Sequence, residues 1–388
     1  MSTSVLVMAK PVGPQCNLAC DYCYYLKKKA SLTPGHMTDD LLESYIKQRL
    51  ELTPDAAHFE WHGGEPTLAG LDFYQKVVRL QKKHARPRQT VTNGLQTNGV
   101  KIDKQWADFL AREKFSVGLS LDGPPDCHNA FRRKAKGGGS FDEVVTAYRL
   151  LRERDVFVNV LCVLNARNVT EPDRLWAFFR DLGVKYLQFL PYVPPMPPPY
   201  QSPSPTAGSL ATGTLAATTQ AIGDFLCRVF DLWLDAGVGK MVIQTFDEAL
   251  RPLVGVPHAL CVHRPECGDV PVLEHDGGFY ACDHFVDPEH LWGNLQNVSL
   301  SALAADPRQV AFGQAKNALP PVCRACEVLE FCHGGCPKDR VDGLNWLCPA
   351  YQKLFRHIRP GLTALARHLK TGASLRSFSF TPDFYTPK

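Results

Sequence analysis

The stretch GPQCNLACDYCYY, residues 13–25, sets three cysteines, Cys16, Cys20 and Cys23, within eight residues. Thiolates at this density bind zinc or an iron–sulfur cluster. A closed site of either kind usually takes four protein ligands. The fourth ligand therefore comes from elsewhere, for example from His36 in a zinc site, or one metal position stays open. An open position is what a catalytic metal site needs, because a substrate or cofactor can occupy it.

The composition is typical of a globular protein. The chain has 388 residues, enough for two domains, with 45% hydrophobic and 21% charged side chains. The net charge of +4 is small and Lys and Arg are scattered, so we expect no nucleic-acid binding. No apolar run approaches the roughly 18 residues of a membrane helix, and residues 1–16 lack a signal-peptide pattern. We expect a cytoplasmic protein, in which clustered thiols indicate metal binding or catalysis more than disulfides.

Short β-rich runs alternate with amphipathic segments between residues 4 and 190. The predicted strands are residues 4–9, 57–62, 88–93, 115–121, 156–164 and 186–190. The predicted helices are residues 39–51, 71–84, 104–114, 140–154 and 171–183. Thr38 and Ser140 are expected N-caps, and Gly183 an expected C-cap. This alternation predicts βαβ units and a parallel sheet, closed fully or partly into a barrel whose site lies at the carboxyl ends of the strands.

The second half of the chain begins with a segment rich in Pro and Ser, residues 192–209. We interpret it as a surface loop or linker, with a lid over the sheet as the alternative. A helix is expected over residues 218–236 and another over residues 349–370. Between them lie short strands and turns, including a hairpin at the DGG of residues 276–278.

Eight further cysteines lie in the last third of the chain: Cys261, Cys267, Cys282, Cys323, Cys326, Cys332, Cys336 and Cys348. Eight is the number of ligands for two closed four-iron clusters. Two zinc sites would use the same number, and the count alone does not separate these alternatives. The remaining three, Cys127, Cys162 and Cys227, are expected to be small buried hydrophobic residues.

The first cysteine group has the pattern C-x-x-x-C-x-x-C, with the aromatic Tyr22 before the third cysteine. This pattern, placed after the first predicted strand, resembles that of the radical S-adenosylmethionine enzymes. The resemblance implies a partial (β/α)6 TIM barrel and a 4Fe–4S cluster whose open iron binds the methionine part of S-adenosylmethionine. One electron from the cluster then generates a 5′-deoxyadenosyl radical.

The same resemblance implies further cofactor contacts. HGGEP, residues 62–66, matches the segment that contacts the methionine amine, a role carried to Gly64 and Glu65. Taken alone, such a motif is more often an ordinary loop. The implied contacts of the ribose and carboxylate are Ser120, Asp122 and Arg132. Taken singly, each of these residues is more often a turn residue or a solvated charge. Val193 is implied as the adenine contact, by its position only.

The spacing of the later cysteines resembles the SPASM extension of radical enzymes that modify peptides. In the two-cluster members of that group the ligands interleave. One auxiliary 4Fe–4S cluster would take Cys261, Cys267, Cys282 and Cys336. The other would take Cys323, Cys326, Cys332 and Cys348. The implied organisation is a radical SAM domain over residues 1–237 and a SPASM domain with a C-terminal helix over residues 238–388.

Motifs along nearly the whole chain resemble the anaerobic sulfatase-maturating enzymes. They are CNLACDYCYY, GGEPTLAGLDFY, LQTNG, GLSLDGP, LQFLPYV, YACDHF, WGNLQ and CRACEVLEFCHGGCPKD. This resemblance implies oxidation of a Cys or Ser in a C/S-x-P/A-x-R motif of an unfolded sulfatase polypeptide to Cα-formylglycine. The target loses a hydrogen atom from Cβ to the deoxyadenosyl radical, a proton to Asp283 and an electron to an auxiliary cluster. It also implies a small electron-donor protein of the flavodoxin or ferredoxin type.

Three site residues keep other interpretations. From the residues alone Asp283 is a carboxylate on the surface or beside the metal ligands. His62 stands where this family is expected to have glutamine, and it could donate a hydrogen bond to the substrate or titrate near neutral pH. Tyr25 is expected at the substrate entrance. Two other functions remain as alternatives: a SPASM maturase that crosslinks a precursor peptide through a thioether or carbon–carbon bond, and a non-catalytic zinc-binding interaction protein.

Overall fold

The computed structural model describes all residues except 1–5, 27, 29–31, 196–214, 376–377 and 379–388. By its contacts the chain forms two compact units that exchange segments. The first unit contains residues 1–121, 128–159 and 267–315, and the second contains residues 122–127, 160–266 and 316–388. The predicted domains, residues 1–237 and 238–388, follow the expected functions and stay a prediction.

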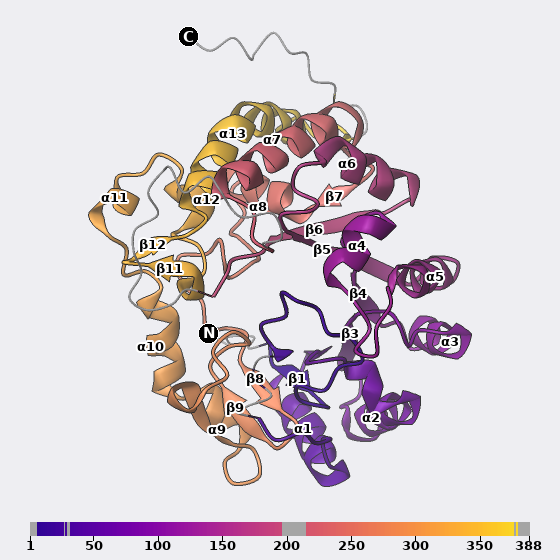
Figure 1. Ribbon diagram of the computed structural model, residues 1–388. Helices are drawn as coiled ribbons and strands as arrows, with labels where there is room; N and C mark the ends of the chain where they lie inside the picture. Colours follow the sequence, from indigo (N-terminus) through magenta and orange to yellow (C-terminus); the bar gives the residue numbers. More distant parts are fainter. Residues whose placement is uncertain (1–5, 27, 29–31, 196–214, 376–377, 379–388) are drawn as a thin grey trace. The chain divides into compact units, whose positions relative to one another are not determined.

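The first unit is built on a mixed sheet with the strand order β10–β9–β8–β1–β2–β3–β4 (Figure 1). The strands are β1 (Met8–Lys10), β2 (Ala56–Trp61), β3 (Thr90–Thr97), β4 (Ser116–Ser120), β8 (Val272–Glu274), β9 (Gly278–Tyr280) and β10 (Leu291–Asn294). The strands from β8 to β4 run parallel, whereas β9 and β10 are antiparallel to their neighbours. The carboxyl ends of the parallel strands therefore meet at one edge.

Helices connect and cover these strands. They are α1 (Asp39–Leu52), α2 (Leu71–His84), α3 (Lys104–Arg112), α5 (Phe141–Arg152), α9 (Leu300–Ala304) and α10 (Pro307–Ala315), with the 3-10 helices η2 (Pro66–Ala69) and η3 (Pro288–His290). The fully buried Trp61 of β2 packs edge to face with Tyr45 of α1 and Tyr74 of α2. This aromatic packing buries the inner faces of both helices and fixes β2 beneath them.

The second unit has its own parallel strands, β5 (Phe157–Leu164), which enters it at residue 160, β6 (Tyr186–Pro191) and β7 (Val242–Ile243). Its helices are α6 (Pro172–Asp181), α7 (Thr219–Ala236), α8 (Gln244–Leu253), α11 (Pro321–Arg324), α12 (Leu329–Cys332) and α13 (Cys348–Lys370), and the hairpin β11 (Arg340–Val341) and β12 (Leu344–Asn345) follows η4 (Pro337–Asp339). The short helix α4 (Pro125–Phe131) spans the change from one unit to the other. Helix α7 packs on both α6 and α13.

The predicted α/β class with a parallel sheet is confirmed. Helix α2 has the predicted bounds, the Thr38 hydroxyl accepts the N–H of Leu41, and Gly183 follows α6 with φ of 76°. The predicted hairpin is also present, because β8 and β9 are antiparallel around Gly277. Ser140 is the N-cap residue of α5, as predicted, but its hydroxyl donates to the Arg132 carbonyl and makes no capping bond to the helix.

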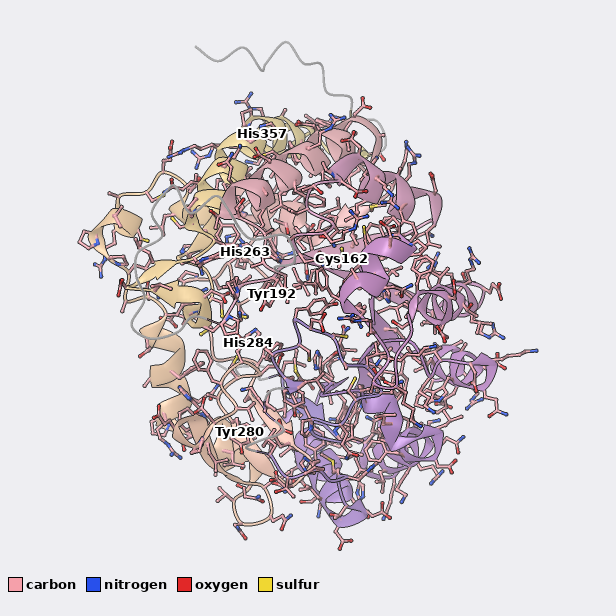
Figure 2. All side chains as sticks on the ribbon, in the orientation of Figure 1. Cys162, Tyr192, His263, Tyr280, His284 and His357 are labelled. Carbon is pink, nitrogen blue, oxygen red and sulfur yellow. The ribbon has the colours of Figure 1, made fainter. Side chains whose placement is uncertain are left out.

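Two further predictions concern other parts of the chain. The isolated cysteines Cys127, Cys162 and Cys227 are buried, as predicted; Cys162 is labelled on β5 in Figure 2. Of the Pro-rich segment 192–209, residues 196–209 lie outside the described residues. Among the described helices, none has the length and hydropathy to cross a membrane.

Candidate active site

The ends of four neighbouring strands supply the framework of the site in the first unit. Lys10, the last residue of β1, is in register with Glu274, the last residue of β8. His62 directly follows β2, and its N–H donates to the Ala9 carbonyl of β1. Asn98 directly follows β3. The parallel pairing brings side chains from distant parts of the sequence to one edge.

The cysteine loop begins directly after β1, at this edge. Cys16, Cys20 and Cys23 are half-buried, and none of the described cysteines forms a disulfide. Burial raises the pKa of the Cys16 thiol to about 12, with smaller contributions from Cys20 and Cys23, so the three thiols are close enough to interact. Metal binding would reverse this effect because it deprotonates its thiol ligands. Among the described residues no group of three or more Cys, His, Asp or Glu side chains is arranged around a single ion.

Polar groups from β3 and from the loop itself face Cys16. The Leu18 N–H donates to the sulfur at 3.4 Å, and Asn98 Nδ2 lies 3.7 Å from it. Asn98 also donates to Asn17 Oδ1 at 2.8 Å. Donors directed at a sulfur stabilise its thiolate form, which is the form that ligates iron. Asn98 was not among the predicted site residues.

The GGEP turn packs directly against the cysteine loop. The Gly64 N–H donates to the Gly13 carbonyl at 2.9 Å, and a Cβ at Gly64 would lie 2.1 Å from the Gln15 carbonyl oxygen. Only glycine therefore fits at this position. The predicted cofactor contact of Gly64 remains a prediction, but its close approach to the loop is a structural requirement of this chain.

Glu65 is a buried polar hub. Its Oε1 accepts from the N–H and hydroxyl of Thr67 and from the Thr97 hydroxyl, and its Oε2 accepts from the Asn98 N–H at 2.7 Å. Burial raises the pKa of Glu65, and these donors partly oppose the shift. The carboxyl group therefore links η2 to the end of β3 beside Cys16. Its predicted contact with the cofactor is a separate role that stays a prediction.

Tyr22 and Arg132, both predicted to contact the cofactor, are in contact with each other. Arg132 Nη1 donates to the Tyr22 hydroxyl at 2.8 Å. The segment carrying Arg132 also holds the loop by its backbone, since the Ala19 N–H donates to the Arg133 carbonyl at 2.8 Å. Arg133 forms an ion pair with Asp21 at 2.7 Å. The cysteine loop is thus fixed on one side by residues 131–134.

Asp283, the predicted base, follows Cys282 at the end of the β8–β9 hairpin. One carboxylate oxygen forms an ion pair with Lys10, and the other accepts a hydrogen bond from the Tyr24 hydroxyl. Burial raises the pKa of Asp283, but the nearby positive charge of Lys10, with His62 and His284, outweighs burial and holds it well below the usual range. The carboxylate is therefore ionised and able to accept a proton.

The two adjacent tyrosines have different environments. Tyr25 is 3% exposed; its hydroxyl donates to the Glu274 carboxylate at 2.7 Å, and Lys10 Nζ lies 3.5 Å from its ring centroid. Tyr24 is 39% exposed and is the one that reaches Asp283. Burial disfavours the predicted substrate contact of Tyr25. His62, the other expected substrate residue, is half-buried, and burial lowers its pKa.

The remaining predicted cofactor contacts are placed less distinctively. Ser120, the last residue of β4, accepts a hydrogen bond from Gln96 at 3.2 Å. Asp122 belongs to the second unit, where it is fully buried and accepts the Val163 N–H at 2.9 Å. Val193 is half-buried just after β6. These positions neither support nor contradict the predicted ribose and adenine contacts.

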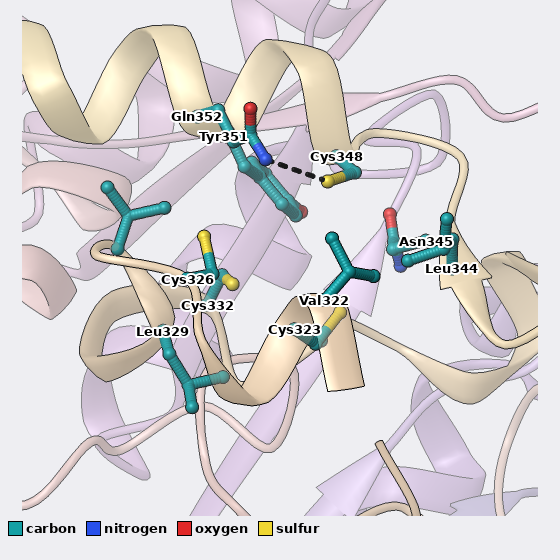
Figure 3. Close-up of a pocket in the computed structure, with 12 residues that line it drawn as sticks. Val322, Cys323, Cys326, Leu329, Cys332, Leu344, Asn345, Cys348, Tyr351 and Gln352 are labelled. Carbon is teal, nitrogen blue, oxygen red and sulfur yellow. Dashed lines mark hydrogen bonds between the residues drawn. The ribbon is translucent and has the colours of Figure 1, made fainter. Parts of the chain in front are cut away.

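The second unit contains a pocket lined by Cys323, Cys326, Cys332 and Cys348, the predicted ligand set of one auxiliary cluster (Figure 3). Cys336 and Cys261 are predicted to share the other cluster. The charge of Cys261 contributes to the raised pKa of the Cys336 thiol, after the larger effect of burial. The remaining ligands of that cluster, Cys267 and Cys282, belong to the first unit. The four thiols of the pocket are of the kind that an iron–sulfur cluster takes as ligands, and the second predicted set stays a prediction.

Comparison with known proteins defines the class. The Radical SAM superfamily model matches residues 11–178, and the SPASM model, an iron–sulfur cluster-binding domain, matches residues 267–327. The chain is therefore a radical SAM enzyme with a SPASM domain.

Relatives over the whole length narrow this class. The serine-type anaerobic sulfatase-maturating enzyme of Bacteroides thetaiotaomicron is 38% identical and covers 94% of this chain and 91% of its own. A cysteine-type enzyme of Clostridium perfringens is 31% identical over 94% of this chain and 99% of its own. A solved structure, native anSMEcpe with bound AdoMet and Cp18Cys peptide, has a TM-score of 0.85 at 32% identity, covering 94% of this chain and 99% of that one. This chain belongs to the anaerobic sulfatase-maturating enzymes.

The sequence interpretation missed several residues that the structure places around Asp283. Lys10, Tyr24 and Glu274 form one network with it. Lys10 is the last residue of a short apolar strand, and a lysine that ends a buried strand next to a metal-binding loop is a detectable signal. Nothing in the sequence indicated that β8 would bring Glu274 to the same edge.

Proposed function

We propose that this chain oxidises a Cys or Ser side chain in a C/S-x-P/A-x-R motif of a sulfatase polypeptide to Cα-formylglycine. The observation that carries the proposal is an ionised carboxylate, Asp283, held by Lys10 and Tyr24 beside the cysteine loop. The enzyme would act in the cytoplasm on unfolded substrate, with electrons from a small flavodoxin- or ferredoxin-type protein.

The residues present fit the cofactors that this reaction needs. Cys16, Cys20 and Cys23 would hold a 4Fe–4S cluster with one open iron, with Gly64, Arg132 and Tyr22 beside S-adenosylmethionine; the eight later cysteines would hold two auxiliary 4Fe–4S clusters. When bound, the open cluster with S-adenosylmethionine supplies hydrogen-atom abstraction from the substrate Cβ, and an auxiliary cluster supplies an acceptor for the second electron.

Asp283 would accept the proton that the target side chain loses. Forming an aldehyde removes two electrons and two hydrogens from the target, so the thiol or hydroxyl proton must go to a base. A carboxylate offers about four lone-pair sites, and Lys10 and Tyr24 use only some of them. Lys10 keeps the group ionised, and Tyr24 fixes its orientation. A Cys target would then give a thioaldehyde that hydrolyses with release of sulfide.

Incubation of the reconstituted, reduced enzyme with matched C-x-P-x-R and S-x-P-x-R peptides tests the reaction. The product is detected by its mass and by its reaction with hydrazines, and the two peptides show which target is preferred. About twelve iron atoms per chain are expected for three four-iron clusters. Formation of a thioether or carbon–carbon crosslink, or a colourless zinc protein, would replace this proposal with one of the alternative functions.

Asp283→Asn tests the base. We expect formylglycine formation to fall by about 10²–10⁴-fold, the usual contribution of a general base, while S-adenosylmethionine is still cleaved to 5′-deoxyadenosine. Asp287→Asn is the matched control, because Asp287 lies on the same segment and bonds to His290 in the 3-10 helix η3. Equal losses in both variants, or a fully active Asp283→Asn enzyme, would remove Asp283 from this role.

A further inference from the structure

The segment around Cys261 is a ligand loop without helix or strand structure. It lies between α8 and Cys267, and residues 259–265 are turns and bends. Within the loop the His263 N–H donates to the Leu260 carbonyl at 3.0 Å and the Arg264 N–H to the Cys261 carbonyl at 3.3 Å. Contacts with other parts of the second unit add to these two turn bonds.

Buried side chains hold this segment from two sides. The Ala259 N–H donates to the Glu248 carboxylate of α8 at 3.1 Å. His258 and His263 contact the carbonyls of Glu330 and Phe331 in α12, at 2.8 and 2.9 Å. His263 is labelled in Figure 2. These contacts tie the loop to neighbouring helices, in addition to the bond that the Arg264 N–H donates to the Cys261 carbonyl within it.

Lys316 donates to three carbonyls of this loop. It is 1% exposed, and its Nζ donates to the Cys261 carbonyl at 2.5 Å, to the Val262 carbonyl at 3.1 Å and to the Arg264 carbonyl. An ammonium group has three donors, and each of these three carbonyls takes one. The short loop therefore curves around the positively charged ammonium group of a buried lysine. Lys316 Nζ donates to the carbonyl of Cys261 itself, so a fixed positive charge is held beside a residue whose thiol is a predicted ligand of the auxiliary cluster.

We propose that Lys316 is a positioning residue for the auxiliary cluster ligated by Cys261, holding the loop in its ligating shape and raising the reduction potential of that cluster. This inference rests on the cluster assignment in the proposed function. Reduction adds a negative charge to the cluster, and a fixed positive charge nearby stabilises the more negative form. A higher potential makes the cluster a better acceptor for the electron that leaves the substrate.

The test is a potentiometric titration, followed by electron paramagnetic resonance, of the full chain carrying Cys16→Ala, Cys20→Ala and Cys23→Ala, so that only the auxiliary clusters contribute. Lys316→Gln removes the charge but keeps a polar side chain, and Lys316→Arg keeps the charge. We expect Lys316→Gln to lower one of the two midpoint potentials by about 59 mV, a tenfold change in the oxidised-to-reduced ratio for one electron. Lys316→Arg should stay near the parent value.

Lys353→Gln is the matched control, because Lys353 lies in the same unit, is partly exposed and pairs with Asp224. It should leave both potentials unchanged. Loss of about four irons from Lys316→Gln alone, the content of one cluster, would support the holding role. Full iron with both potentials unchanged in Lys316→Gln, or an equal fall in Lys316→Arg, would overturn the inference. A parent chain without about eight irons would instead contradict the cluster assignment itself.

Discussion

The cysteine loop after β1 and the pocket in the second unit are both thiol sites, but their surroundings differ. The loop brings three thiols next to polar side chains, among them Asn98 and Arg132, which face the sulfur or the adjacent tyrosine. The pocket brings four thiols together among apolar residues, including Val328, Leu329 and Leu344. The predicted open cluster site is thus surrounded by polar groups, and the predicted closed site is lined mainly by thiols and apolar side chains.

Removing either set of thiols is the strongest test of this difference. Cys16→Ala, Cys20→Ala and Cys23→Ala together, or Cys323→Ala, Cys326→Ala, Cys332→Ala and Cys348→Ala together, should each lower the iron content by about four per chain. Only the first set should abolish production of 5′-deoxyadenosine. The measurements are iron analysis and chromatography of the nucleoside products. Equal loss of cofactor cleavage in both variants would break the distinction between an open and a closed site.

The two tyrosines after the loop sharpen the comparison on a smaller scale. Tyr24→Phe removes a hydrogen bond to the ionised Asp283, which is worth about 1.5–3 kcal/mol, or roughly 10–100-fold in the rate of formylglycine formation. Tyr25→Phe removes the bond to buried Glu274 and should act mainly on stability. Rates at saturating peptide and denaturation midpoints separate the two effects. A slower enzyme in the Tyr25 variant alone would reverse the assignment.

Glu65→Gln tests whether the polar hub supports the loop. The amide nitrogen of Gln would face donors that now bond to the carboxylate, leaving buried groups unsatisfied at a cost of about 1–3 kcal/mol. We expect a lower free energy of unfolding, measured with denaturant on the metal-free chain. Glu51→Gln, at an exposed position on α1, is the control and should change little. An unchanged stability in both variants would show that the hub is dispensable.

The fourth prediction concerns the pH dependence of stability that His128 causes. This fully buried ring contacts Ser140 at 3.0 Å, and burial, with the charge of Arg132, lowers its pKa from 6.5 to about 2. The unfolded chain therefore binds a proton below pH 6.5 that the folded chain does not. Stability should fall as the pH drops from 6.5 towards 4, by at most about 1.4 kcal/mol per pH unit. Denaturation at several pH values should show a shallower slope in His128→Gln.

The repeated βαβ pattern made the first half of the fold predictable from the sequence, since each helix and strand has its own hydrophobic period. Helix α2 was predicted with its observed bounds because Gly70 and Ala85 bracket an uninterrupted apolar stripe. The pairing of β8 with β1 was not predictable, because it joins segments more than 250 residues apart and neither strand is longer than three residues.

The same reasoning explains which site residues were found. The number and spacing of the cysteines indicated metal sites, and the resemblance to the SPASM extension supplied the grouping of the four that line the pocket. Asp283 came from a family resemblance. Lys10 and Tyr24 reach Asp283, and Lys316 reaches the loop of Cys261, through contacts between distant parts of the sequence that no local pattern indicates. Ser140 was predicted correctly as the N-cap of α5, but the bond of its hydroxyl to the Arg132 carbonyl is a tertiary contact that the sequence did not indicate.

The parallel pairing of β1 with β8 has a consequence for how the chain is made. Residue 8 leaves the ribosome 264 residues before its partner, residue 272. At about 5–20 residues per second, synthesis leaves that edge of β1 unpaired for roughly 13–53 seconds. During this interval the three thiols of the loop are already present but Lys10 has neither of its carboxylate partners. Assembly of the first cluster on a nascent chain would therefore precede completion of the fold around it.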